Sequence, residues 1–250
     1  MATEYGTIKR VELEQFSNVR SNGLRAIELA GDDRLIGVAI TDGEQQIMLF
    51  SNEGKAIRFA ETDVRAMGRS AKGVRGMRVT IAAAAAEEVE DTDVDSDDED
   101  TDSSFVSRIV SLVVVPETGE VLCASANGYG KRTPVDDFPT KKRGGKGVIA
   151  IKTSERNGEL VGAVAIDVTK ELMLISDGGT LVRTRASEIA QTGRNAQGVR
   201  LIRLGEDETL VGVEAIEAVE DEELELLEEL EASEIQNVED AESTDTDAAE

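Results

Sequence analysis

A repeated pattern of paired glycines constrains the fold of this chain more than any other feature. Each copy has a short apolar run, a tight turn with glycine, a strand that carries Lys or Arg, and a second glycine that opens another β-rich run. The turn glycines are spaced by 48, 74 and 50 residues: Gly6, Gly54, Gly128 and Gly178. The second glycines are spaced by 50, 74 and 51 residues: Gly23, Gly73, Gly147 and Gly198. Two series that agree indicate four structural repeats instead of four unrelated hairpins.

A period near 50 residues, with several short strands in each copy, is typical of a propeller-type array. The strands are rich in Val, Ile and Leu, as in residues 35–40, 110–115 and 160–166. Turns such as N-E-G and A-N-G place glycine where a hairpin needs a positive φ. We therefore predict an all-β fold with four blade-like sheets.

Both glycine series lengthen at the same link, which contains an acidic stretch. Residues 87–102 carry 11 acidic groups and no basic one, so this stretch is an insertion between repeats. We predict two blade units in residues 1–81, an acidic insertion or linker at 82–104, two further units in 105–215 and an acidic tail at 216–250.

The formal net charge of −25 argues against a nucleic-acid partner only when it is averaged over the whole chain. Residues 214–250 carry 17 acidic groups, and no Lys or Arg follows Arg203. Without this tail and the insertion, 24 acidic groups face all 27 basic ones, a balance of +3. The body is therefore mildly basic, with two separate acidic segments.

The tail allows two interpretations. Leucines at i, i+3 and i+6 within residues 220–231 predict a short amphipathic helix, followed by a polar, disordered end. The tail either keeps the protein soluble or competes, as a tethered polyanion, for the basic surface of the body. The acidic insertion lacks the glycine and terminal Glu of a calcium loop, so we predict no metal site there.

A basic loop precedes each second glycine. Three loops share the spacing R-x-x-x-G through Arg69, Arg143 and Arg194, and Arg20 lies one residue closer to its glycine. Arg and Lys neutralise phosphate, and glycine lets backbone N–H groups approach its oxygens, although each loop alone could be a solvated turn. With these four arginines, the candidate DNA-binding residues are Lys72, Arg75, Lys131, Arg132, Lys141, Lys142, Lys146, Arg183, Arg185 and Arg200.

Composition weighs against catalysis and cofactor binding. The chain has no His, which is the usual general base and the commonest metal ligand. Its single cysteine, Cys123, lies in an apolar run and is expected to be a buried, reduced thiol. No apolar stretch reaches the roughly 18 residues that a membrane helix needs. We therefore expect a cytoplasmic, nucleoid-associated protein with no cofactor, catalytic residue, metal site or membrane partner.

The loop K-K-R-G-G-K-G at 141–147 resembles the signature heptapeptide Q-R-R-G-G-K-G of the DNA gyrase A subunit, with Lys141 in place of Gln. Four further segments also resemble sequences of that subunit: D-R-L-I-G-V-A-I-T-D-G at 33–43, V-R-A-M-G-R-S-A-K-G-V-R-G at 64–76, N-G-Y-G-K-R-T at 127–133 and T-L-V-R-T-R-A-S-E-I at 180–189. The resemblance covers essentially residues 1–215.

This resemblance implies a β-pinwheel, a six-bladed relative of the propeller in which neighbouring blades exchange strands and the basic perimeter wraps double-stranded DNA. Four units here imply about four of the six blades, as in a C-terminal fragment. The family has its heptapeptide in the first blade, whereas two units precede residues 141–147 here. That loop is therefore expected to be a related copy in a later blade.

The resemblance also implies partners: double-stranded DNA, the rest of the gyrase A subunit and the gyrase B subunit. The nucleophilic tyrosine of gyrase has no counterpart here, because Tyr5 and Tyr129 both lie beside turn glycines. This chain alone is therefore not expected to cut or rejoin DNA. Two other functions stay open: the C-terminal domain of the topoisomerase IV A subunit, and a propeller that binds an acidic protein.

Overall fold

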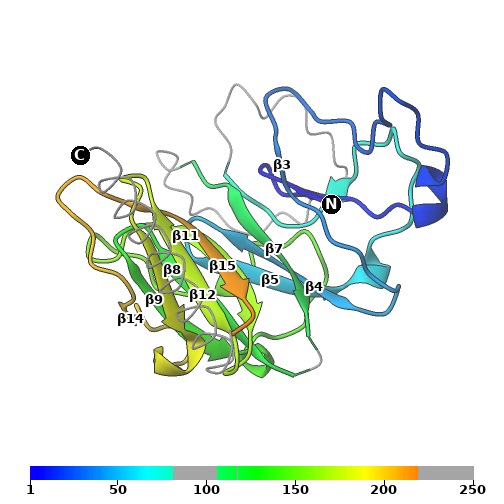
Figure 1. Cartoon of the computed structure of the whole chain (residues 1–250). Coiled ribbons are helices and arrows are strands. Elements are labelled where there is room, and N and C mark those ends of the chain that lie inside the picture. The colour runs from blue at the N-terminus through cyan, green and yellow to red at the C-terminus, as the bar shows by residue number, and fades with distance from the viewer. Residues whose placement is uncertain (81–105, 117, 219–250) are drawn as a thin grey trace, which may run out of the picture. The chain divides into compact units, whose positions relative to one another are not determined.

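The computed structural model describes residues 1–80, 106–116 and 118–218, and the unit Met1–Ile216 is all-β (Figure 1). Within these ranges the helical elements are short 3-10 turns: η1 (Leu13–Phe16), η2 (Glu61–Asp63), η4 (Val135–Asp137) and η5 (Ala186–Glu188). The helix predicted near 220–231 and the whole acidic insertion predicted at 82–104 lie outside the described residues.

The strands form four antiparallel sheets, as the repeat pattern predicts. In the first sheet the order is β3 (Leu35–Gly37), β1 (Ala2–Thr3), β2 (Thr7–Ile8) and β6 (Val74–Arg75). In the second it is β7 (Ile109–Val115), β4 (Gln46–Ser51), β5 (Lys55–Ala60) and β10 (Val148–Ile149). In the third it is β11 (Leu160–Ile166), β8 (Glu120–Ser125), β9 (Tyr129–Pro134) and β14 (Val199–Arg200). In the fourth it is β15 (Leu210–Ile216), β12 (Glu171–Ser176) and β13 (Leu181–Arg185).

Neighbouring repeats exchange strands. The short strand after each second glycine leaves its own repeat and joins the preceding sheet, so that β6 pairs with β2, β10 with β5 and β14 with β9. This is the exchange that the family resemblance implies. The residues after Gly23 form no strand, so the β-rich run predicted there is wrong.

The second glycines are required by this exchange. A Cβ atom on Gly147 would lie 2.4 Å from the carbonyl oxygen of Ala56, and one on Gly198 would lie 2.4 Å from that of Gly130. Both glycines also have φ near +80°, at +78° and +87°. Only a residue without a side chain allows the donated strand to approach the accepting strand so closely.

The turn glycines confirm the repeat with one correction. Gly54 has a positive φ, and its N–H donates to the carbonyl oxygen of Ser51 at 2.9 Å. In the fourth repeat the equivalent residue is Gly179, with φ of +84° and an N–H that donates to Ser176 at 3.2 Å. The prediction of Gly178 for this position is therefore wrong by one residue.

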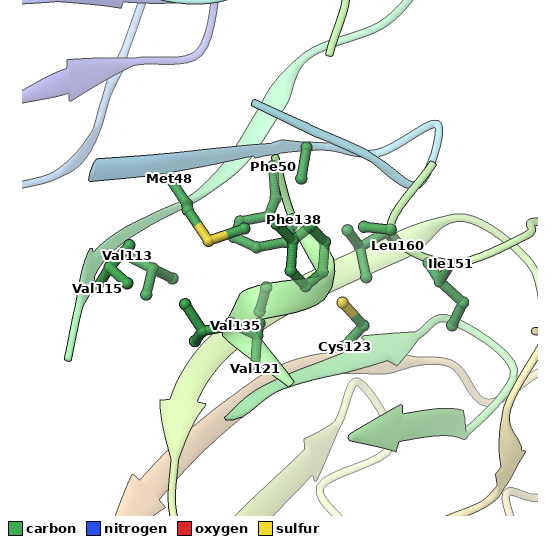
Figure 2. Packing of buried hydrophobic residues seen from close by; sticks show 13 residues of the cluster. Met48, Phe50, Val113, Val115, Val121, Cys123, Val135, Phe138, Ile151 and Leu160 are labelled. Atoms are coloured by element: carbon green, nitrogen blue, oxygen red, sulfur yellow. The ribbon is translucent and has the colours of Figure 1, made fainter. Parts of the chain in front are cut away.

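The core lies between consecutive sheets. Figure 2 shows the cluster between the second and third sheets, where Phe50 and Phe138 meet edge to face with ring centroids 6.3 Å apart. Cys123 lies in the same cluster, and burial raises the pKa of its thiol to about 12. Ten residues after the turn glycine, Val64, Phe138 and Ile189 are each buried where the chain leaves its 3-10 turn. These anchors fix the start of each loop that follows.

Candidate nucleic-acid interface

Three of the four basic loops occupy equivalent positions on the sheets. Each loop begins in a bridge to the preceding sheet, Arg10–Ala66, Arg58–Thr140 or Arg132–Gln191. Arg58 and Arg132 lie in β5 and β9, and Arg10 lies two residues after β2. Each ends at a second glycine, where the donated strand pairs with that same sheet. The loops 66–73, 140–147 and 191–198 therefore run along the strands β2, β5 and β9. These strands lie on the opposite side of their sheets from β3, β7 and β11.

Two of the three arginines of the R-x-x-x-G spacing, Arg143 and Arg194, connect their loops to the residues beside the preceding loop. Arg143 donates from Nη1 to the carbonyl oxygen of Arg75 at 2.8 Å, and from Nε to that of Asp63 at 3.1 Å. Arg194 donates from Nη1 to the carbonyl oxygen of Ile149 at 3.2 Å. Because a guanidinium has five N–H donors, each of these arginines brings positive charge to the loop surface and also fixes the preceding loop.

The other loop residues fall into two groups by exposure. Arg69, Arg75, Arg143, Lys146 and Arg194 are half-buried. Exposed cations flank them: Arg20, Lys72, Lys141, Lys142 and Arg200. Within loop 140–147, Gly144 adopts φ of +86° and its N–H donates to the carbonyl oxygen of Gly76 at 2.7 Å. Gly145 is exposed, and its carbonyl oxygen accepts from the N–H of Arg78 at 2.9 Å.

Lys131 and Arg132, two of the candidate residues, lie inside the third sheet. Lys131 is fully buried, and its Nζ donates to Thr133 Oγ1 at 2.7 Å and to the carbonyl oxygen of Gly193 at 3.0 Å. Desolvation lowers the pKa of Lys131. Arg132 donates to the carbonyl oxygen of Ile189 and pairs with Glu120. Lys131 therefore holds loop 191–198 against the sheet, and Arg132 holds the residue Ile189 that precedes this loop. Both cations are buried and offer no surface to a ligand.

Arg132 is one of a series of arginines that brace the hairpins. Arg58 donates to Gln46, Arg132 to Glu120 and Arg183 to Glu171. In each pair the partner stands 12 residues earlier, at the first position of the neighbouring strand. This spacing is visible in the sequence, and it could have separated bracing arginines from surface ones. Arg183 and Arg185 are exposed, and both lie beside Glu171.

An arginine outside the candidate set lies beside Arg200. The guanidinium carbons of Arg156 and Arg200 lie 4.8 and 5.4 Å from the ring centre of Tyr129. Arg200 donates to the phenol oxygen at 2.9 Å. Hydrogen bonds from Arg200 and then Arg156 lower the pKa of Tyr129. Sequence reasoning missed Arg156 because it lies outside the basic loops that precede the second glycines.

Other kinds of site are not seen in the part of the chain that the structure describes. There, no three or more His, Cys, Asp or Glu side chains gather as a metal site would require. The described helical turns are also far too short to cross a membrane.

A family model and curated relatives both relate this chain to the C-terminal part of DNA gyrase A subunits. A family model described as the DNA gyrase C-terminal domain, beta-propeller, matches residues 1–42, 45–82, 119–167 and 170–217. The gyrase A subunit of Haemophilus influenzae is 50% identical over 220 residues, which cover 86% of this chain and 25% of that protein. The gyrase A subunit of Escherichia coli K12 is 47% identical over 216 residues, 86% of this chain and 22% of that protein.

Two solved structures share the fold. A DNA gyrase A C-terminal domain superposes with a TM-score of 0.69 at 26% identity, covering 86% of this chain and 64% of that one. The C-terminal domain of a DNA topoisomerase IV gives a TM-score of 0.72 at 22% identity, covering 93% of this chain and 65% of that one. The chain spans about a quarter of the length of the curated relatives it matches.

Proposed function

Because this chain belongs to the family of DNA gyrase C-terminal domains, we propose that it binds double-stranded DNA along its basic loops and bends it. The observation that carries this proposal is the equivalent placement of loops 66–73, 140–147 and 191–198 on three successive sheets. A ligand with a repeating charge, such as a phosphate backbone, can meet the same chemical group at each loop.

The chemistry of the loops favours backbone contact over base readout. Their cations are Lys and Arg beside glycines, which suits phosphate oxygens, and no exposed aromatic cluster for base stacking accompanies the described loops. We propose direct contacts from Arg20, Lys72, Lys141, Lys142 and Arg200. Arg69, Arg75, Arg143, Lys146, Arg183, Arg185 and Arg194 would add to the local positive potential. Lys131 and Arg132 are left out because they are buried.

The proposed context is a type II topoisomerase. In it, the rest of the gyrase A subunit and the gyrase B subunit would supply cleavage and ATP hydrolysis, and this module would hold the flanking duplex. The gyrase assignment is favoured over topoisomerase IV because the relatives at 47–50% identity are gyrase A subunits. The likeness to the topoisomerase IV domain, at 22% identity, extends to the fold alone.

A charge-removal experiment tests the proposal. The double variant Lys141→Gln/Lys142→Gln should weaken binding to duplexes of any sequence alike. It should also lower the slope of log affinity against log salt by about 0.9 for each phosphate that is no longer neutralised, roughly 1.8 in all. The matched control is Arg34→Gln/Lys170→Gln, which removes two cations from other loops and should leave the slope unchanged.

Three results would contradict the proposal. Weaker binding to one DNA sequence alone would mean base readout. An unchanged salt slope would place the duplex elsewhere, and tight binding to an acidic protein with none to DNA would favour the alternative partner class.

A further inference from the structure

The three strand exchanges differ in charge balance. At each exchange the residue two positions after the second glycine faces a residue of the accepting strand, and each pair contains one cation: Arg75–Thr7, Ile149–Lys55 and Arg200–Tyr129. In the second sheet the cation is neutralised, because Lys55 Nζ lies 2.6 Å from Glu53 Oε2. In the third sheet Arg200 faces the ring of Tyr129 instead, so the charge of this junction depends on what surrounds the ring.

A second arginine lies on the same tyrosine. The guanidinium carbons of Arg156 and Arg200 lie 4.8 and 5.4 Å from the ring centre of Tyr129, and Arg200 Nη2 donates to the phenol oxygen at 2.9 Å. Both arginines are exposed, whereas Tyr129 is only 8% exposed. In the part of the chain that the structure describes, neither guanidinium forms an ion pair with a carboxylate. Like charges this close repel one another, so an anion that bridges them would lower the energy of the site.

The backbone around Arg156 is fixed to the turn that carries Tyr129. Asn127 precedes the turn glycine of the third repeat, and its Nδ2 donates to the carbonyl oxygens of Glu155 and Arg156 at 3.0 and 3.2 Å. The backbone N–H of Asn127 also donates to the carbonyl oxygen of Asn157 at 3.0 Å. Arg156 therefore approaches Tyr129 from a loop whose backbone is held in place before any ligand binds.

This loop, residues 152–158, is also joined to the basic loop 191–198. Asn157 is fully buried, and its Nδ2 donates to the carbonyl oxygen of Lys152 in its own loop at 3.0 Å and to that of Gln197 in the basic loop at 3.2 Å. The two loops therefore form one surface, with both exposed guanidinium groups beside it. Cations on a fixed backbone lose less conformational entropy when they bind a ligand.

We propose that Arg156 and Arg200 form a phosphate-binding site beside Tyr129, which holds one phosphate of the duplex where loop 191–198 ends. A phosphodiester has two free oxygens and each guanidinium has five N–H donors, so both arginines can donate to one phosphate while the ring of Tyr129 supports them. The duplex as the source of the phosphate rests on the proposed function. The affinity for phosphate itself rests only on the geometry of these three side chains.

Occupation of the site changes the acidity of Tyr129. Hydrogen bonds from Arg200 and then Arg156 lower the pKa of the phenol in the free protein. A phosphate held by the same arginines competes for their N–H groups and places negative charge beside the phenol. Both effects disfavour the phenolate, so the pKa of Tyr129 should rise when phosphate binds.

The test follows the ionisation of Tyr129 by NMR of tyrosine labelled with carbon-13 at the phenol carbon. The chain has two tyrosines, so Tyr5→Phe in the full chain leaves a single signal. Its pKa is measured at one ionic strength in chloride, in acetate and in inorganic phosphate, and also with a short DNA duplex. Phosphate and the duplex should each raise the pKa of Tyr129 relative to chloride, and Arg156→Gln should remove most of this rise.

Binding measurements separate this contact from the general effect of charge. Arg156→Gln should lower the affinity for the duplex by about tenfold at about 0.15 M salt, because it removes a hydrogen bond between charged groups. The matched control is Arg34→Gln, which removes an exposed cation from another loop. It should change the affinity by less than about twofold, because salt screens distant charges.

Failure of the site and failure of the proposed function give different results. Duplex binding that leaves the pKa of Tyr129 unchanged would overturn the site, although DNA binding itself would stand. A rise in acetate as large as that in phosphate would overturn the preference for phosphate. Equal affinities of Arg156→Gln and Arg34→Gln for the duplex would remove Arg156 from the interface. If inorganic phosphate raised the pKa of Tyr129 but no duplex bound, the phosphate site would be supported and the proposed function overturned.

Discussion

Replacing Gly147 with Ala should unfold the junction between the second and third repeats. The new Cβ would lie 2.4 Å from the carbonyl oxygen of Ala56 and 2.8 Å from its carbon, so β10 must move away from β5. A left-handed conformation costs a residue with a side chain about 1–2 kcal/mol. Displacing the pairs Val148–Ala56 and Ile149–Lys55 breaks about two hydrogen bonds, each contributing about 1 kcal/mol. We expect the free energy of unfolding to fall by about 3–4 kcal/mol.

The matched control is Gly145→Ala in the same loop, where the nearest atom to a new Cβ, apart from chain neighbours, is Ile57 Cδ1 at 3.7 Å. Both variants are compared with the parent by urea unfolding followed by circular dichroism, and by thermal unfolding. Gly147→Ala should lower Tm by about 6–15 °C, and Gly145→Ala should change stability by less than about 0.5 kcal/mol. If the two variants were equally stable, close approach of the donated strand would not be what requires glycine at 147.

Four further predictions concern the core, the arginines that brace the hairpins, the buried thiol and the acidic tail. Phe138→Ala should cost about 3–5 kcal/mol in urea unfolding, because Phe138 is buried against Phe50; a decrease below about 1 kcal/mol would contradict the packing described. Arg132→Met should lower the free energy of unfolding by about 3 kcal/mol, because it leaves Glu120 without its partner. Adding Glu120→Leu to this variant should restore much of the lost stability. If stability did not recover, Arg132 would stabilise the protein independently of Glu120. Between pH 9 and about 12 the Cys123 thiol ionises in the unfolded chain but not in the folded one, because burial raises its pKa. The free energy of unfolding of the parent should therefore fall by about 1.4 kcal/mol per pH unit relative to Cys123→Ala. If the free energy of unfolding of both proteins changed equally with pH, the thiol would not be buried. Residues 217–250 carry 16 of the acidic groups and no basic one, so deleting them should tighten DNA binding. The gain should be largest at 0.01 M salt, where the Debye length is about 30 Å, and smaller at higher salt. If the full chain and the shortened chain bound DNA equally at both salt concentrations, the tail would not compete with DNA.

The sequence predicts the local part of the fold well. Turn glycines, second glycines and apolar strands depend on residues a few positions apart, and they identify four sheets. The register of the fourth turn is ambiguous because Gly178 and Gly179 both tolerate a positive φ. The strand expected after Gly23 does not form. The runs after the other second glycines are strands because they pair with residues far away in the sequence, which local patterns do not show.

The candidate site is harder to predict because exposure is a tertiary property. Lys131 and Lys142 are both lysines near a glycine, yet Lys131 is buried because its Nζ reaches the carbonyl oxygen of Gly193, 62 residues away. Arg156 meets Arg200 only through the ring of Tyr129. The bracing arginines could be predicted in part. Their 12-residue spacing from Gln or Glu can be read in the sequence, but only the structure shows that this spacing places the two side chains in contact.

Strand exchange also determines how this array would carry mechanical tension. Loop 140–147 begins beside Arg58 of the second sheet and ends in β10, which is hydrogen-bonded to that same sheet, while the chain continues into the third. A stiff duplex bent against the loops would tend to straighten and pull them outward. The force would be shared by the third sheet, to whose repeat loop 140–147 belongs, and the second sheet, which binds the strand β10 that follows this loop. A junction between repeats would then yield only when an entire edge strand is peeled away.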